Sequence, residues 1–108
     1  MIDQNRVTAL EKILKENPND AFARYALGQE YSGAGETEAA LSEFEKLLAA
    51  HPDYTNGYFM SAQMLDRAGR GDEAQAMLEK GIESARRTNN RHAQSEMEAM
   101  LEELQLRG

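Results

Sequence analysis

The sequence has 108 residues, enough for one small domain with one modest core. Its net charge of -7, with Lys and Arg residues scattered along the chain, argues against a surface for nucleic acid or for an acidic membrane. The absence of Cys excludes disulfides and thiol chemistry, and no apolar run is long enough to span a bilayer. The first residues lack the pattern of a secretory signal, so we expect a cytoplasmic protein.

The predicted elements are all helices, because Ala, Leu, Met, Glu, Gln and Arg are common and β-branched residues are rare. The first predicted helix covers residues 3–16. Val7, Leu10, Ile13 and Leu14 recur there at helical spacing, and Asn17-Pro18 follows.

A 34-residue period organises the middle of the chain. Pro18 and Pro52 are 34 residues apart, and so are Gly35 and Gly69. Each period contains two apolar stretches with helical spacing, separated by a glycine-containing turn. We therefore expect two successive helical hairpins.

The last predicted helix covers residues 90–106. One stripe along it is apolar and consists of Ala93, Met97, Met100, Leu101 and Leu104. The opposite face carries Glu98, Glu102 and Gln105. This arrangement is typical of a terminal helix that covers a repeat array and presents its polar side to water.

The pattern resembles the tetratricopeptide repeat. Repeat one would cover residues 21–54 and repeat two residues 55–88. The positions that match the family pattern are Leu27, Gly28, Tyr31, Ala40, Phe44 and Pro52, then Tyr58, Ala62, Leu65, Ala74, Leu78 and Gly81. The departures from the pattern are Arg24, Leu47, Ser61 and Arg86. Arg86 replaces the closing proline of repeat two, so the second helix of that repeat is free to continue toward Thr88.

The resemblance implies an all-α fold, an α-solenoid of antiparallel helix hairpins. Within a single domain of residues 1–108, the two full repeats would follow an N-terminal half-repeat at 3–16 and precede the capping helix at 90–106. In this family the first helices of successive repeats line a concave groove that holds another polypeptide. We therefore predict a protein–protein interaction module that binds an extended or helical peptide.

The resemblance also assigns residues to the groove. Carried over position by position, they are Phe22, Tyr25, Ala26, Gln29, Asn56, Phe59, Met60, Gln63 and Arg67. Tyr25 and Phe59 would face away from the second helix of their own repeat. The family's clamp for acidic chaperone tails is absent, because Tyr25 and Gln29 replace its Lys and Asn. The alternative is that a second copy of the chain covers the apolar groove in a self-associating homo-oligomer.

No catalytic, metal or cofactor site is predicted. His51 precedes the turn proline and His92 lies early in the capping helix, and the chain has no Cys and no His pair at helical spacing. The acidic residues lie in the first turns of helices or on exposed faces, where solvation is the ordinary explanation. We therefore expect a protein that is not an enzyme.

Overall fold

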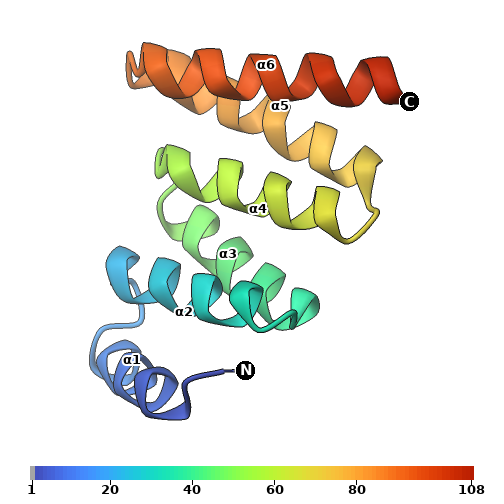
Figure 1. Cartoon of the computed structure of the whole chain (residues 1–108). Coiled ribbons are helices and arrows are strands. Elements are labelled where there is room, and N and C mark those ends of the chain that lie inside the picture. Colours follow the sequence, from blue (N-terminus) through green and yellow to red (C-terminus); the bar gives the residue numbers. More distant parts are fainter. Residues whose placement is uncertain (1) are drawn as a thin grey trace. The chain divides into compact units, whose positions relative to one another are not determined.

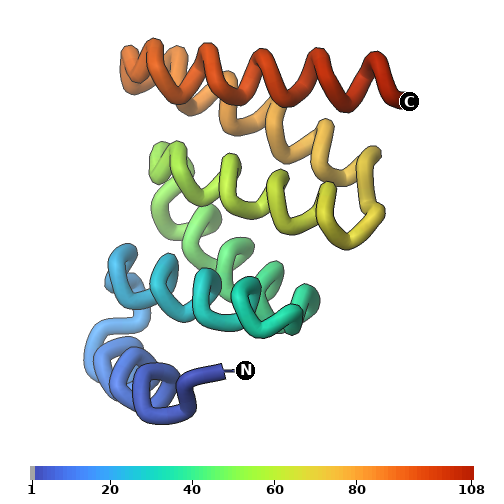
Figure 2. Tube along the Cα trace, in the orientation of Figure 1, coloured from blue at the N-terminus to red at the C-terminus, as the bar shows by residue number. Residues whose placement is uncertain are grey.

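The computed structural model describes residues 2–108, and within that range the chain forms six helices and no strand (Figures 1 and 2). The helices are α1 (Gln4–Glu16), α2 (Ala21–Gly33), α3 (Thr37–Ala50), α4 (Thr55–Arg67), α5 (Gly71–Arg87) and α6 (Arg91–Arg107). The all-α prediction is confirmed. The chain divides into two compact units, one ending at His51 and the other beginning at Pro52.

Polar side chains fix the beginnings of three helices. Asp3 accepts a hydrogen bond from the Arg6 amide at 3.2 Å, and Asp20 accepts one from the Ala23 amide at 2.8 Å. Asn90 caps α6 by the same geometry. These oxygens bind amide groups that have no partner inside the helix, which sets where each helix starts.

The first unit consists of α1, α2 and α3. A cluster of buried apolar residues joins α1 to α2: Val7, Leu10, Leu14, Ala23, Ala26 and Leu27. Gly28 brings α2 close to α3, since a Cβ atom there would lie 2.7 Å from Cε1 of Phe44. The departure at Arg24 is explained by a short ion pair, because its guanidinium lies 2.7 Å from the Glu43 carboxylate in a largely buried position.

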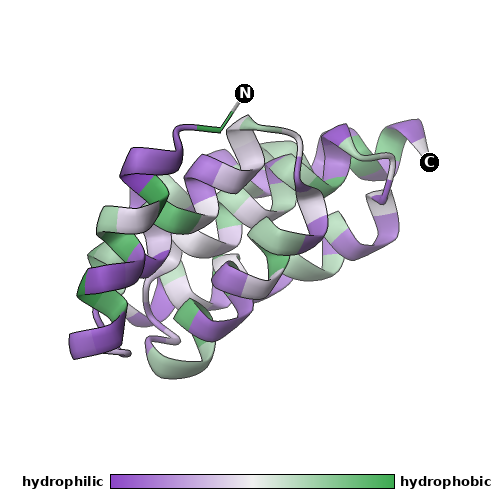
Figure 3. Cartoon of the chain, turned by 90° about the horizontal axis from the view of Figure 1, so that it is seen from below, coloured by the Kyte–Doolittle hydropathy of each residue, from purple (hydrophilic) through white to green (hydrophobic). Residues whose placement is uncertain are grey.

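The second unit consists of α4, α5 and α6, with a core formed by Tyr58, Ala62, Leu65, Ala74, Leu78, Ile82, Met97 and Leu104. Gly81 lies at its centre, where a Cβ atom would meet Sδ of Met97 at 2.5 Å and Cβ of Tyr58 at 2.7 Å. The buried Ser61 hydroxyl donates to the Gly57 carbonyl at 2.8 Å, which explains how a polar residue fits there. In Figure 3, hydrophilic and hydrophobic stretches alternate along the helices.

The helix connections follow the predicted turns. Gly35 and Gly69 have φ angles of 78° and 77°, in the left-handed region that a side chain disfavours. Asn89, with φ 57°, takes this role between α5 and α6. With no proline to stop it, α5 continues to Arg87, so α6 begins at Arg91, 36 residues after α4 begins at Thr55.

A donor at the end of each second helix binds the loop that precedes the first helix of the same hairpin. In the first unit, the Nε2 atom of His51 lies 2.6 Å from the Asn19 carbonyl oxygen, to which it donates. In the second, the Arg87 guanidinium donates to the Asp53 carboxylate at 2.9 Å. These side chains close the open end of each hairpin, and we call the two contacts the hairpin clamps.

Candidate peptide-binding pocket

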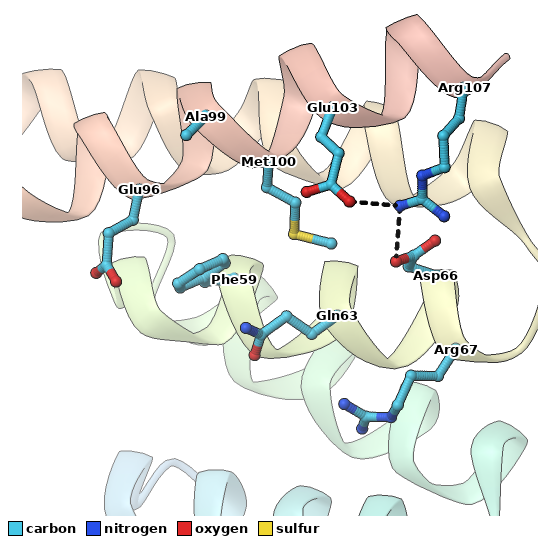
Figure 4. A pocket seen from close by; sticks show the side chains of 9 residues that line it. All are labelled: Phe59, Gln63, Asp66, Arg67, Glu96, Ala99, Met100, Glu103 and Arg107. Atoms are coloured by element: carbon cyan, nitrogen blue, oxygen red, sulfur yellow. Dashed lines mark hydrogen bonds and ion pairs between the residues drawn. The ribbon is translucent and has the colours of Figure 1, made fainter.

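A depression in the second unit lies between α4 and α6 and has a volume of about 580 Å³ (Figure 4). We call it the α4–α6 pocket. Its lining residues are Phe59, Gln63, Asp66 and Arg67 from α4, and Glu96, Ala99, Met100, Glu103 and Arg107 from α6. Both walls are single helices, so the positions of these side chains are set by the packing of α4 and α6 on α5.

Apolar side chains form the middle of the α4–α6 pocket. Figure 4 shows Phe59 from α4 and Met100 from α6 extending into the space between the two helices, with Ala99 above them. Phe59 and Met100 are each half-buried, so part of both side chains stays accessible. An aromatic ring and a flexible thioether together provide an adaptable apolar contact surface.

An ion-pair bridge closes one end of the pocket. The Nη2 atom of Arg107 lies 3.2 Å from Oδ2 of Asp66 and 3.5 Å from Oε1 of Glu103. The bridge connects α6 to α4 directly (Figure 4). Because these side chains are substantially exposed, its contribution to stability is small, and its main effect is to match the charge of Arg107.

The opposite end of the pocket carries Glu96, whose side chain is 47% exposed. Its Oε1 atom lies 3.2 Å from Nε2 of His92, one turn earlier on the same helix. In Figure 4 the Glu96 carboxylate lies on the Phe59 side of the pocket, whereas Arg67 extends from α4 near the end closed by Arg107. The pocket therefore has an acidic end, an apolar middle and an end of mixed charge.

The structure brings three of the predicted groove residues together in this pocket, namely Phe59, Gln63 and Arg67. Asn56 lies elsewhere, in a polar depression formed by the loops around Asp53 and Asn89. Met60 is half-buried on α4 and is not among the residues that line the α4–α6 pocket.

The four predicted groove residues of α2 differ among themselves. Phe22 is 71% exposed, whereas Ala26 is 8% exposed and belongs to the core with α1, which leaves little of its side chain for a partner. The Gln29 amide donates to the Tyr25 hydroxyl at 3.3 Å. The expectation that Tyr25 faces away from its own second helix is wrong: its ring centroid lies 6.2 Å from that of Phe44 on α3. A long side chain at this position reaches around α2, so Tyr25 contributes to packing.

The α6 wall was missed by sequence reasoning, which treated this helix only as a cover for the core. The missing information was the length of α5. Moving the predicted groove positions 60, 63 and 67 forward by the observed 36 residues gives 96, 99 and 103, which all line the pocket. A shift of 34 residues gives other positions. The absence of proline at Arg86 was the available signal for a longer helix and a changed register.

The described residues contain no group of three or more His, Asp or Glu side chains placed to hold a metal ion. None of the helices in the same range has the length and apolar character needed to cross a membrane. Burial raises the pKa of two tyrosines, Tyr31 and Tyr58, and the hydrogen bond to Arg70 lowers the pKa of Glu73. These three residues lie outside the lining of the α4–α6 pocket.

A family model described as a tetratricopeptide repeat matches residues 31–101, which is more than half of the chain. The chain belongs to the tetratricopeptide repeat family. The resemblance predicted from the residues is thereby confirmed, together with the helical-repeat fold. Members of this family are in general interaction scaffolds without catalytic activity, and the fold supports protein partners in general.

Individual relatives agree with this assignment. A TPR repeat-containing protein of Pseudomonas aeruginosa is 28% identical over 98 residues, covering 91% of this chain and 93% of that protein. The solution structure of a tetratricopeptide repeat domain protein from Salinibacter ruber is 33% identical, with a TM-score of 0.75 and coverage of 82% and 89%. A protein of Bordetella parapertussis has the same fold, at 22% identity, with a TM-score of 0.80 and coverage of 94% and 88%.

Proposed function

We propose that this chain binds a segment of another polypeptide in the α4–α6 pocket and that it works as a protein–protein interaction module without catalysis. The supporting observation is that Phe59 and Met100, from two different helices, leave accessible apolar surface in a depression with a polar rim. Apolar surface of this kind with polar surroundings is typical of sites that bind proteins or peptides.

The size of the pocket fits this proposal. A cavity of about 580 Å³ accommodates one or two side chains of a peptide, and its open form suits a segment that continues along the helices. Tetratricopeptide repeats provide such a surface with their first helices, and α4 and α6 both occupy that place in the hairpin order. Within the second unit, Asn56 and Met60 stay predicted contacts, and Phe22, Tyr25 and Gln29 stay predicted contacts of the first unit.

Selection from a displayed library of random peptides tests the proposal. The wild-type chain should enrich a related set of peptides, and Phe59→Ala should lose most of that enrichment, because aromatic anchors often contribute about 2 kcal/mol or more. Leu106→Ala is the matched control, since Leu106 is an apolar residue of α6 that is 80% exposed and does not line the pocket. Equal loss with both variants, or no loss with Phe59→Ala, would remove the pocket from the proposal.

Self-association is the second candidate function. The exposed apolar side chains of Phe22 and Leu106 favour it, because large apolar groups in contact with water often mark an interface. Analytical ultracentrifugation over a range of concentrations distinguishes the two. A dimer that Phe59→Ala converts to a folded monomer would assign the pocket to a second copy of the chain, whereas a monomer at all concentrations favours peptide binding.

Charge also bears on the class of partner, and the location of the chain stays a prediction. A net charge of -7 disfavours nucleic acid and acidic membranes as partners, and the predicted location is the cytoplasm. Fractionation of the source cell, followed by detection of the chain in each fraction, tests the location.

A further inference from the structure

We infer that the α4–α6 pocket prefers a cationic peptide segment, one that places an apolar side chain against Phe59 and Met100 and a Lys or Arg side chain beside Glu96. This inference rests on the proposed function and specifies the chemistry of the partner. It is carried by the distribution of charge along the pocket.

The lining is acidic overall. Three carboxylates (Asp66, Glu96, Glu103) and two guanidinium groups (Arg67, Arg107) line the pocket, which gives a formal charge of 2 − 3 = −1. The whole chain has a net charge of -7, so its long-range field also attracts cations. A peptide with positive charge is therefore favoured both in its approach and at the site.

The two ends of the pocket are not equivalent. At one end the charge of Arg107 is already paired, since the carboxylates of Asp66 and Glu103 lie 3.2 Å and 3.5 Å from its guanidinium. An acidic ligand group would have to compete with both carboxylates there. At the other end, Glu96 is about half exposed and lies on the Phe59 side of the pocket (Figure 4). A cation bound beside Glu96 would belong to the same peptide as an apolar group on Phe59.

Arg67 does not change this preference. In Figure 4 its guanidinium lies below α4, on the other side of Gln63 from Glu96 and the Phe59 ring. An apolar side chain and a neighbouring cation therefore meet Phe59 and Glu96 without passing Arg67. The same pair of groups with an acid in place of the cation would put two carboxylates beside each other.

Two fluorescein-labelled synthetic peptides test the inference with the full chain. They share a flexible Gly-Ser background and a central Leu, and they differ only in having Lys or Glu on both sides of that Leu. Fluorescence anisotropy should show the Lys peptide binding at least about tenfold more tightly than the Glu peptide, and added salt should reduce the difference.

Two charge-neutralising variants locate the preference. Glu96→Gln should weaken binding of the Lys peptide by about twofold to fivefold, the range for a partly exposed ion pair. Glu102→Gln removes the same charge from the same helix at a position outside the pocket, and it should leave the affinity unchanged. Thermal melting of both variants verifies that α6 stays folded.

Each of the other outcomes bears on the cationic preference or on its assignment to Glu96. Tighter binding of the Glu peptide, lost in Phe59→Ala, overturns the cationic preference and upholds the proposed function. Equal weakening by Glu96→Gln and Glu102→Gln shows general charge attraction and overturns the assignment to Glu96. If neither peptide binds, the inference fails, while the library selection with Phe59→Ala decides the proposed function separately.

Discussion

Gly28 lies where α2 and α3 pack most closely, so it provides a residue-level test of the first unit. A Cβ atom at Gly28 would lie 2.7 Å from the Phe44 ring, a distance that forces movement. We expect Gly28→Ala to lower the free energy of unfolding by about 1–3 kcal/mol, the usual cost of overpacking. Urea unfolding followed by circular dichroism measures this change.

The matched control is Gly33→Ala in the same helix. A Cβ atom at Gly33 would meet nothing within 4 Å, and alanine restricts the unfolded chain. Gly33→Ala should therefore leave stability unchanged or raise it by up to about 1 kcal/mol. If Gly28→Ala proves as stable as Gly33→Ala, the Phe44 ring moves easily and the tight contact is not a constraint on the hairpin.

Tyr58 gives a pH-dependent prediction. Burial is the largest cause that raises the pKa of Tyr58, and its hydroxyl donates to the Pro52 carbonyl at 2.7 Å. At neutral pH, Tyr58→Phe should lose about 1 kcal/mol of stability with that hydrogen bond. The raised pKa means that the folded state favours the neutral phenol. The contribution of Tyr58 is therefore fully present below the unfolded pKa of about 10 and is lost as pH rises through the raised pKa.

Denaturant titrations at neutral and alkaline pH measure this effect. The stability difference between the wild type and Tyr58→Phe should shrink above pH of about 10. A constant difference across this range would show that Tyr58 ionises as easily in the folded protein as in the unfolded chain.

At individual positions, the sequence predicted the packing of small residues better than the contacts of long side chains. Gly28 and Gly81 both match the repeat pattern, and both occupy close approaches between helices, because only a missing side chain fits such a contact. Arg24 was recognised as a departure, yet its partner Glu43 lies on another helix and no local pattern identifies it. Tyr25 was misplaced because a helical position fixes the direction of Cβ but not the reach of an aromatic ring.

At the level of the element, α6 combines two roles, since it covers the core and forms one wall of the pocket. Leu104 is 5% exposed and Leu106 is 80% exposed, although they are two residues apart. Leu104→Ala should therefore cost about 2–5 kcal/mol, whereas Leu106→Ala should change stability by less than about 0.5 kcal/mol. Thermal melting of the two variants measures the contrast, and equal melting temperatures would show that α6 does not pack on α5 in solution.

The boundaries of α6 were predicted to within one residue, at 90–106 against Arg91–Arg107. The orientation of α6 relative to α4 was not predicted. The reason is that α5 is three residues longer than α3, and three residues turn a helix through most of a turn before the chain enters α6. An apolar stripe shows which side of a helix is buried. It does not show which neighbouring helix supplies the other wall of a pocket, so Met100 was assigned to the core stripe alone.

At the level of the whole molecule, the prediction is a spectrum dominated by helix. The six helices include most of the described residues, and the connections between them are short. Far-ultraviolet circular dichroism of the full chain should show helix with negligible sheet. A substantial strand component would contradict the repeat architecture from which the proposed pocket follows.

The hairpin clamps also bear on how such chains are duplicated and recombined. His51 binds Asn19, and Arg87 binds Asp53, so each clamp joins a loop to the helix end that lies about one repeat later. A segment cut at the start of a first helix, such as 21–54 or 55–88, separates the donor from its acceptor. A segment cut before the loop, such as 18–51 or 52–87, keeps both. We therefore expect a transplanted or duplicated hairpin to keep its clamp when its genetic boundary falls beside the proline turn, as the boundary of the two units at His51 and Pro52 does.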